Sequence, residues 1–113
     1  MPELLEVVRD AAHEKKADDV VTLEVGTRTI VADWFVVATG RSKIQTRAIA
    51  DGIAEALESA GRGKPRMEGY SDGGWILIDA GPVVAHVFTP EQRSFYNLER
   101  LWGAAETRRA QES

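Results

Sequence analysis

An apolar strand followed at once by a long amphipathic helix occupies residues 33–60. Residues 33–39, DWFVVAT, are rich in the β-branched and aromatic side chains that favour a buried strand. After Gly40, Ser42 and Gln45 have the spacing of a capping box, and apolar residues then recur at helical intervals. Since a strand, a helix and a later strand of one sheet form a crossover unit, this stretch predicts some parallel strand pairing.

Further elements precede and follow this unit. Residues 3–15 carry an apolar stripe at helical spacing, and residues 20–25, VVTLEV, favour a strand that ends at Gly26. A short strand is predicted at 67–70. Residues 89–92, Thr-Pro-Glu-Gln, combine a capping residue, a proline at the first helical position and a glutamine at the third, which predicts a last helix.

The stretch WILIDAGPVVAHVF at residues 75–88 predicts a β-hairpin. Its two β-rich runs meet at Ala80-Gly81-Pro82, and a proline belongs in a turn because it cannot donate to a strand ladder. A two-residue Ala80-Gly81 loop would place Trp75 opposite His86, whereas a three-residue loop would reverse the faces. With the two-residue loop, the residues that share one face are Trp75, Leu77, Asp79, Val84, His86 and Phe88.

These elements predict an α/β (α+β) domain in which helices flank a mixed β-sheet. The 113 residues, 43% of them hydrophobic and 28% charged, suit one compact domain with a modest core. No long Pro/Gly/Ser linker divides the chain. We expect a single domain at 1–103 and a polar C-terminal tail at 104–113.

Composition excludes several kinds of site. The chain has no cysteine, which rules out disulfides, zinc–thiolate sites and thiol nucleophiles. His13 and His86 are its only histidines, and no spacing brings two metal ligands together. A net charge of −4 argues against a free-standing nucleic-acid binder, so any contact with RNA is expected to be peripheral. Apolar runs are far shorter than the roughly 20 residues of a membrane span.

Two features of the sequence are compatible with phosphate binding, and each has a simpler structural explanation. The loop TGRS at 39–42 lies between a strand and a helix, where anions can bind, but it also serves as a tight turn with a helix cap. Arg62, Lys64 and Arg66 form a basic loop that is adequately explained as a solvated turn. A glycine-rich phosphate loop is absent from the sequence, and no cofactor is predicted.

Catalysis is the less favoured interpretation. Metal-dependent phosphoryl transfer needs two or three carboxylates directed at shared cations. Asp33, Asp72 and Asp79 are available, but they form no D-x-D or D-x-E pair, and hydrogen bonding in turns accounts for them. No catalytic residue is therefore assigned, and a metal-dependent nucleotidyltransferase-like enzyme stays an alternative.

The aromatic stretch HVFTPEQRSFYNLERLW at 86–102 combines core and interface features. Phe95, Leu98 and Trp102 follow one another at i, i+3 and i+7, the pattern of a helix packed on a core. Arg93 and Tyr96 are of the types that anchor protein interfaces. Composition alone favours core over interface, because a small domain must bury many large apolar groups.

Several runs of residues, in order and covering about residues 3–103, strongly resemble the ribosomal silencing factor family (RsfS, also called Iojap). They are D-W-F-V-V-A-T-G-R-S-x-x-Q at 33–45, E-G at 68–69, W-I-L-I-D at 75–79, V-V-A-H-V-F at 83–88 and R-S-F-Y-N-L-E-R-L-W at 93–102.

The resemblance implies a nucleotidyltransferase-like fold without catalytic carboxylates, and therefore a protein that is not an enzyme. It implies binding to the large ribosomal subunit through ribosomal protein L-fourteen. The bound factor would block association with the small subunit and repress translation, with a further role in large-subunit biogenesis. With acidic residues and no leader at its N-terminus, the chain is expected in the bacterial cytoplasm.

The resemblance also transfers a partner-binding surface onto this sequence. Phe95 and Trp102 are expected to anchor the core, whereas His86, Arg93, Tyr96 and Glu99 are expected to face the partner. A homodimer that uses the hairpin edge or the aromatic helix as its self-interface stays open as an alternative. The full set of partner-binding residues is Trp75, Asp79, His86, Arg93, Tyr96, Leu98 and Glu99.

Overall fold

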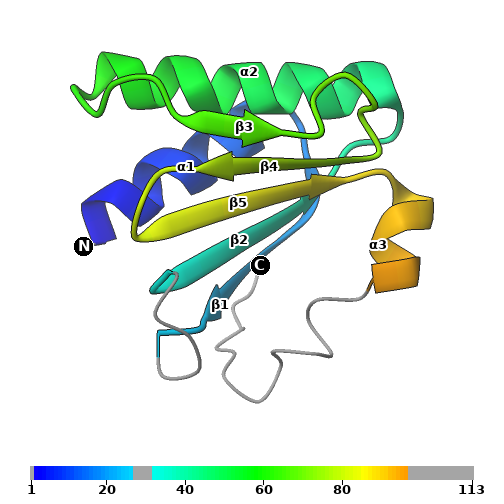
Figure 1. Cartoon of the computed structure of the whole chain (residues 1–113), viewed down its shortest axis with the longest axis horizontal. Coiled ribbons are helices and arrows are strands. Elements are labelled where there is room, and N and C mark those ends of the chain that lie inside the picture. The colour runs from blue at the N-terminus through cyan, green and yellow to red at the C-terminus, as the bar shows by residue number, and fades with distance from the viewer. Residues whose placement is uncertain (1, 27–31, 97–113) are drawn as a thin grey trace.

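A five-stranded mixed sheet with two helices on one face forms the body of the molecule (Figure 1). The computed structural model describes residues 2–26 and 32–96. Along the chain the elements are α1 (Pro2–Glu14), β1 (Asp18–Glu24), β2 (Trp34–Thr39), α2 (Lys43–Ser59), β3 (Arg66–Glu68), β4 (Trp75–Asp79), β5 (Val83–Phe88) and α3 (Pro90–Tyr96).

The strands lie in the order β1-β2-β5-β4-β3. Strands β2 and β5 pair in parallel, and the other three neighbouring pairs are antiparallel. Helix α2 lies in the connection between β2 and the later strands, as a parallel crossover requires. The predicted mixed sheet and its crossover unit are therefore confirmed.

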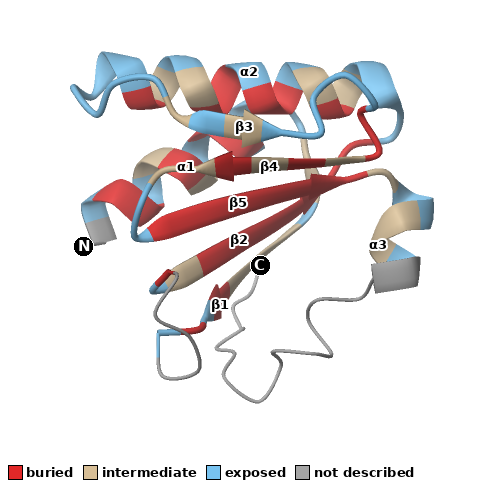
Figure 2. Cartoon of the chain, viewed as in Figure 1, coloured by how far each residue is buried: buried red, intermediate tan, exposed pale blue. Residues whose placement is uncertain are grey.

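The main core lies between the sheet and the two long helices, α1 and α2. Apolar residues recur at helical spacing on α1 and α2, and each helix turns this stripe towards the sheet (Figure 2). Burial of such a side chain stabilises the fold by about 1.5–3 kcal/mol. The fully buried members include Val8 and Ala12 of α1, Ile49 and Ile53 of α2, and Ile76, Ile78 and Val87 of the sheet.

A second apolar cluster lies on the opposite face of the sheet. It contains Leu23, Phe35, Val37 and Phe88, with Trp75 half-buried against it. Strand β2 is therefore buried on both faces, which explains why its sequence is a continuous apolar run and does not alternate.

The hairpin register differs from the predicted one by two residues. Trp75 pairs with Phe88, and Leu77 pairs with His86, so the expected pairing of Trp75 with His86 is wrong. The turn is centred on Gly81-Pro82: Ala80 N donates to Val83 O at 3.0 Å, and Gly81 has φ +87°, which favours glycine. A shift of two residues preserves the alternation of a strand, so the predicted face is confirmed.

The start of α2 corrects the predicted capping box in one detail. Ser42 Oγ accepts a hydrogen bond from Gln45 N at 3.1 Å, as expected of an N-cap residue. Gln45 Oε1 accepts instead from Arg41 N at 2.8 Å, one residue before the cap. The reciprocal bond to Ser42 N is thus replaced by a bond to the preceding residue.

The other elements agree with the sequence to within a few residues. Strand β1 begins at Asp18 and not at residue 20, and β3 ends at Glu68, before the predicted end at residue 70. Pro90 is the first residue of α3, as predicted. The predicted tail at 104–113 falls outside the described residues. None of the helices in the described part of the chain is long and apolar enough to cross a membrane.

Candidate partner-binding surface

A hydrogen bond joins the two largest polar side chains of the hairpin. Trp75 Nε1 donates to His86 Nδ1 at 3.1 Å across the neighbouring strands β4 and β5. Because an indole N–H can only donate, Nδ1 must accept, and the proton of the neutral imidazole then lies on Nε2. The bond fixes both the tautomer of His86 and the orientation of the Trp75 ring.

His86 is enclosed by aromatic rings. Its ring centroid lies 4.6 Å from that of Phe35 in an edge-on arrangement and 6.2 Å from that of Phe88 in a stacked one. Burial lowers the pKa of His86 from 6.5 to about 4, so the ring is neutral at pH 7. Its Nε2 is buried and has no hydrogen-bonding partner among residues 2–26 and 32–96.

The expectation that His86 faces a partner needs correction. The side chain is only 5% exposed, because strand alternation directs it onto the second apolar cluster. His86 therefore supports the residue beside it and offers little surface of its own.

Strand β4 carries the accessible part of the hairpin. Its burial alternates, so Ile76 and Ile78 lie in the main core while Trp75, Leu77 and Asp79 are half-buried on the opposite side. We call these three residues the β4 row. Trp75 packs on Phe88 with ring centroids 5.0 Å apart. Leu77 shares the face of Trp75 and Asp79, and its place in the row was signalled by the period of two in the sequence.

The Asp79 carboxylate also shapes the turn. Its Oδ1 accepts a hydrogen bond from Gly81 N at 2.9 Å, the local bond typical of an Asx turn. Asp79 therefore combines a structural bond with a half-exposed negative charge at the end of the β4 row.

Arg93 connects α3 to the opposite edge of the sheet. Its Nη1 donates to Asp19 O and to Thr39 Oγ1, each at 2.7 Å, which joins the first turns of α3 to β1 and β2. The half-buried guanidinium borders a depression of about 310 Å³. Arg93 was expected to face a partner, and the structure adds a role in seating α3.

Three further predicted site residues cannot be located on this surface. Tyr96 is the last residue of α3, and the placement of its side chain is not described. Leu98 and Glu99 lie outside the described residues, as does Trp102, and the side chain of Phe95 is likewise not described. These assignments therefore stay predictions.

Residues 69–74 form the loop that leads to Trp75, and helix α2 holds this loop in place. Arg47 donates from Nε to Tyr70 O and from Nη2 to Ser71 O, both at 3.0 Å. The buried Thr46 Oγ1 donates to Gly73 O at 2.6 Å. We call Thr46 and Arg47 the loop clamp. Sequence reasoning missed it, because these residues lie more than twenty positions from the loop that they bind.

Glycines let the same loop approach β4 closely. Gly69 has φ +82°, and a Cβ atom there would overlap the carbonyl oxygen of Trp75. Gly74 O accepts a bond from Thr89 N at 3.0 Å, so the loop also contacts the start of α3. The start of β4 is thus held by both α2 and α3.

Two of the three carboxylates considered for catalysis, those of Asp72 and Asp79, accept structural hydrogen bonds. Asp72 Oδ2 accepts from Gly74 N at 3.0 Å, and Asp72 precedes β4 whereas Asp79 ends it. No group of three or more His, Cys, Asp or Glu side chains suited to a metal occurs among the described residues. A shared-metal arrangement of Asp33, Asp72 and Asp79 therefore receives no support from their positions.

The molecule is a small α/β domain that carries a half-exposed row of residues on one strand. The sequence model of a family described as "Ribosomal silencing factor during starvation" matches residues 1–113. The chain belongs to this ribosomal silencing factor family, whose members regulate translation at the ribosome and are not enzymes.

Individual relatives agree with this assignment. The chain is 42% identical over 105 residues to a ribosomal silencing factor RsfS of Halalkalibacterium halodurans, covering 93% of this chain and 90% of the relative. It is 39% identical to that of Bacillus subtilis, covering 90% and 86%. A crystal structure of a protein from Chromobacterium violaceum has a TM-score of 0.88 at 35% identity, covering 91% of this chain and 86% of that one. The predicted fold class is thus confirmed.

Proposed function

We propose that this chain binds the large ribosomal subunit through ribosomal protein L-fourteen and thereby prevents the small subunit from joining. The observation that carries the proposal is the β4 row: Trp75, Leu77 and Asp79 are half-exposed on the side of the sheet away from α1 and α2. Membership in the silencing factor family supplies the ribosome as the target.

The chemistry of the row suits a basic protein partner. Trp75 and Leu77 offer an apolar centre, and Asp79 offers a negative charge beside it. Interfaces of this kind combine an aromatic anchor with a polar rim, and about 800 Å² per partner is the usual size. The net charge of −4 would favour encounter with a basic ribosomal protein.

His86 and Arg93 would act from behind this surface. His86 holds the Trp75 indole through Nδ1, and Arg93 seats α3 against β1 and β2. Tyr96, Leu98 and Glu99 extend the proposed surface beyond the residues whose side chains are described. A rigid aromatic anchor reduces the entropy lost on binding, which favours affinity.

The mechanism is steric. No bond is made or broken, and the factor occupies a surface that the small subunit needs. A bacterial cytoplasmic protein acting in this way would repress translation, and the same binding would allow a role in large-subunit biogenesis.

Paired variants test the surface. Asp79→Asn keeps an oxygen that can cap Gly81 but removes the charge, and Glu55→Gln removes an equal charge from the exposed side of α2, on the other face of the sheet. We expect the Asp79 variant to bind purified large subunits roughly 5- to 30-fold more weakly, and the Glu55 variant to bind normally. Co-sedimentation measures both affinities.

Two outcomes would contradict the proposal. Wild-type protein that sediments only with small subunits would overturn the target. Equal affinities for the two variants would remove Asp79 from the interface. Sedimentation velocity of the free chain tests the alternative of a homodimer that covers the same surface.

A further inference from the structure

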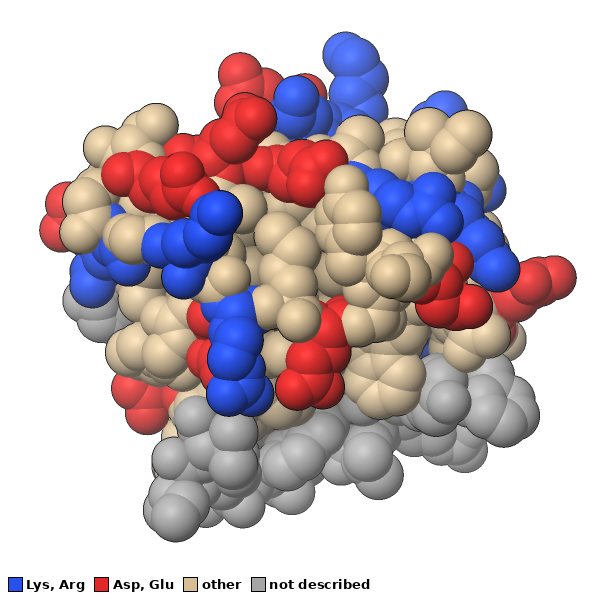
Figure 3. Space-filling view, turned by 45° about the horizontal axis from the view of Figure 1, so that its top comes forward, with Lys and Arg blue, Asp and Glu red and all other residues tan. Residues whose placement is uncertain are grey.

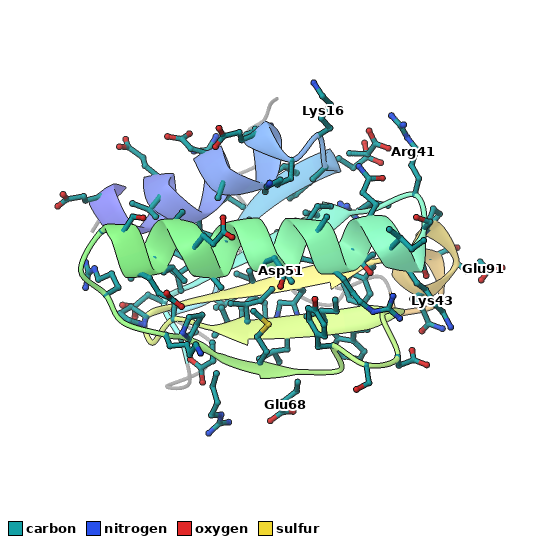
Figure 4. The ribbon with its side chains drawn as sticks, turned by 90° about the horizontal axis from the view of Figure 1, so that it is seen from above. Lys16, Arg41, Lys43, Asp51, Glu68 and Glu91 are labelled. Atoms are coloured by element: carbon teal, nitrogen blue, oxygen red, sulfur yellow. The ribbon has the colours of Figure 1, made fainter. Side chains whose placement is uncertain are left out.

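Three exposed cations gather at the end of the molecule where α2 begins. Lys16 comes from the turn between α1 and β1, Arg41 from the loop after β2, and Lys43 is the first residue of α2. In Figure 4, Lys16 and Arg41 extend outward on the α1 side of α2, and Lys43 extends on the opposite side of α2, near Glu91. We call these three cations the basic corner.

Gln45 holds the segments of the basic corner together. Its Oε1 accepts from Arg41 N at 2.8 Å, and its Nε2 donates to the carbonyl oxygens of Lys15 and Lys16 at 3.4 and 3.2 Å. Lys16 itself has φ +65°, a conformation that a non-glycine residue adopts only when its surroundings hold it. The juxtaposition of the cations is therefore built into the fold.

Helix stability does not account for the position of these charges. The N-terminus of a helix favours anions, yet α2 has Lys43 at its first position and no acidic residue in its first turn. Its last turn holds Glu58 and no basic residue, which is the reverse of the favourable order. Lys43 is therefore unfavourable for the helix dipole, and Asp72 is the anion that lies beside it.

The ion pairs of the basic corner leave its cations available. Arg41 Nε lies 3.2 Å from Asp18 Oδ2, and Lys43 Nζ lies 3.8 Å from Asp72 Oδ1. The two cationic side chains are 72% and 58% exposed, and exposed pairs of this kind contribute little. A phosphate can replace either carboxylate at small cost.

Acidic side chains also extend along α2, away from the basic corner. Asp51, Glu55 and Glu58 are exposed along α2 at helical spacing, beyond its cationic first turns. Figure 3 shows acidic side chains in a band across the helical side, with basic side chains at several places around it.

The basic corner is continuous with the surface proposed to bind the ribosome. A depression of about 510 Å³ is lined by Arg41, Lys43, Gly74, Thr89 and Gln92, together with the acidic residues Asp72 and Glu91. Gly74 directly precedes Trp75, and Thr89 directly precedes α3. A partner that covers the β4 row would thus bring its neighbouring surface to the corner.

We propose that the basic corner binds the phosphodiester backbone of RNA, as a secondary contact with the large ribosomal subunit. This inference rests on the proposed function, which brings the chain to that subunit. RNA presents one phosphate per nucleotide, so three cations on separate segments can each neutralise one. The net charge of −4 requires the β4 row to supply the remaining affinity.

Salt dependence tests the proposal. The variant Lys16→Gln/Arg41→Gln/Lys43→Gln removes the corner, and Arg62→Gln/Lys64→Gln removes two exposed cations beyond the other end of α2. Affinity for large subunits is measured between about 50 and 200 mM salt. We expect the corner variant to lose about tenfold in affinity at low salt and its log–log salt slope to fall by about 2 to 3. The control should keep the wild-type slope.

Each outcome has one meaning. Equal slopes for the corner variant and wild type, or equal losses in both variants, would overturn the RNA contact while leaving the proposed function intact. A wild-type chain that does not bind large subunits would overturn the proposed function and this inference with it. The thermal midpoint of the corner variant should not fall, because Lys43→Gln removes an unfavourable charge from α2.

A crosslink identifies the chemical class of the partner. A photoreactive residue in place of Lys43, in the full chain bound to large subunits, should crosslink to ribosomal RNA. A crosslink confined to ribosomal protein would show that an acidic protein segment occupies the corner, and the RNA proposal would then be wrong.

Discussion

Trp75 on β4 and His86 on β5 are joined by a hydrogen bond of 3.1 Å, although the two residues are not paired opposite each other in the ladder. Leu77 is the residue opposite His86, so the bond runs diagonally between strands, within reach of a long side chain. It connects a half-exposed aromatic ring to a buried imidazole. This one hydrogen bond therefore connects the accessible surface to the second apolar cluster.

Burial of His86 predicts a pH-dependent stability. The pKa of the folded state, about 4, lies below the usual 6.5, so the unfolded chain binds more protons between these values. Stability is therefore complete above about pH 6.5 and decreases as the pH falls towards 4, by up to about 3 kcal/mol. Urea unfolding at a series of pH values measures this decrease.

Substitution of each histidine isolates the effect. His86→Gln should flatten the dependence between pH 4 and 6.5, whereas His13→Gln, on the exposed surface of α1, should leave it unchanged. An unaltered pH profile in the His86 variant would show that another group is responsible.

Loss of the imidazole acceptor should change the orientation of the Trp75 ring more than it changes the stability of the fold. His86→Phe removes the acceptor of the indole N–H, but it also removes a buried Nε2 that has no partner among the described residues. These effects oppose each other, so we expect stability to change by less than about 1.5 kcal/mol. The Trp75 indole resonance should shift, and affinity for large subunits should fall roughly tenfold.

The measurement compares NMR spectra with co-sedimentation of the same variant. His86→Gln is the reference, because its amide can offer an acceptor to the indole. A Phe variant that binds normally with an unshifted indole resonance would mean that the hydrogen bond does not orient Trp75.

The order of the elements and the parallel crossover could be predicted because they depend on local patterns. Apolar spacing in 43–60 and the apolar run at 33–39 each specify an element without reference to the rest of the chain. The hairpin register could not be fixed in this way. It depends on whether Ala80 or Pro82 joins Gly81 in the turn, and both choices keep the same residues on the same face.

The candidate site was less predictable because its contacts join distant parts of the chain. Period-two alternation identified the face of Trp75 and Asp79, but it could not tell which members of that face are covered. His86 has the same alternation and is buried, because β5 is central in the sheet whereas β4 lies nearer its edge. The loop clamp has no sequence signal of its own.

Removal of one clamp bond should loosen the approach to Trp75. Thr46→Val has nearly the same shape but lacks the hydroxyl that donates to the buried Gly73 O at 2.6 Å. We expect a loss of about 1–3 kcal/mol in unfolding free energy, because a buried carbonyl loses its partner. Amide hydrogen exchange should quicken across residues 69–74 before it changes in α1. Uniform change across the whole chain would argue against a local clamp.

Two glycines with the same backbone conformation allow the stability cost of backbone strain to be distinguished from the cost of steric overlap. Gly63 has φ +80° and Gly69 has φ +82°, but an added Cβ meets nothing within 4 Å at Gly63 and overlaps the Trp75 carbonyl oxygen at Gly69. Gly63→Ala should therefore cost about 1 kcal/mol, from backbone conformation alone. Gly69→Ala should cost about 3 kcal/mol or more, because the loop must move away from β4. Thermal and urea unfolding of both variants give the comparison, and equal losses would show that the approach of the loop to Trp75 is not sterically restricted.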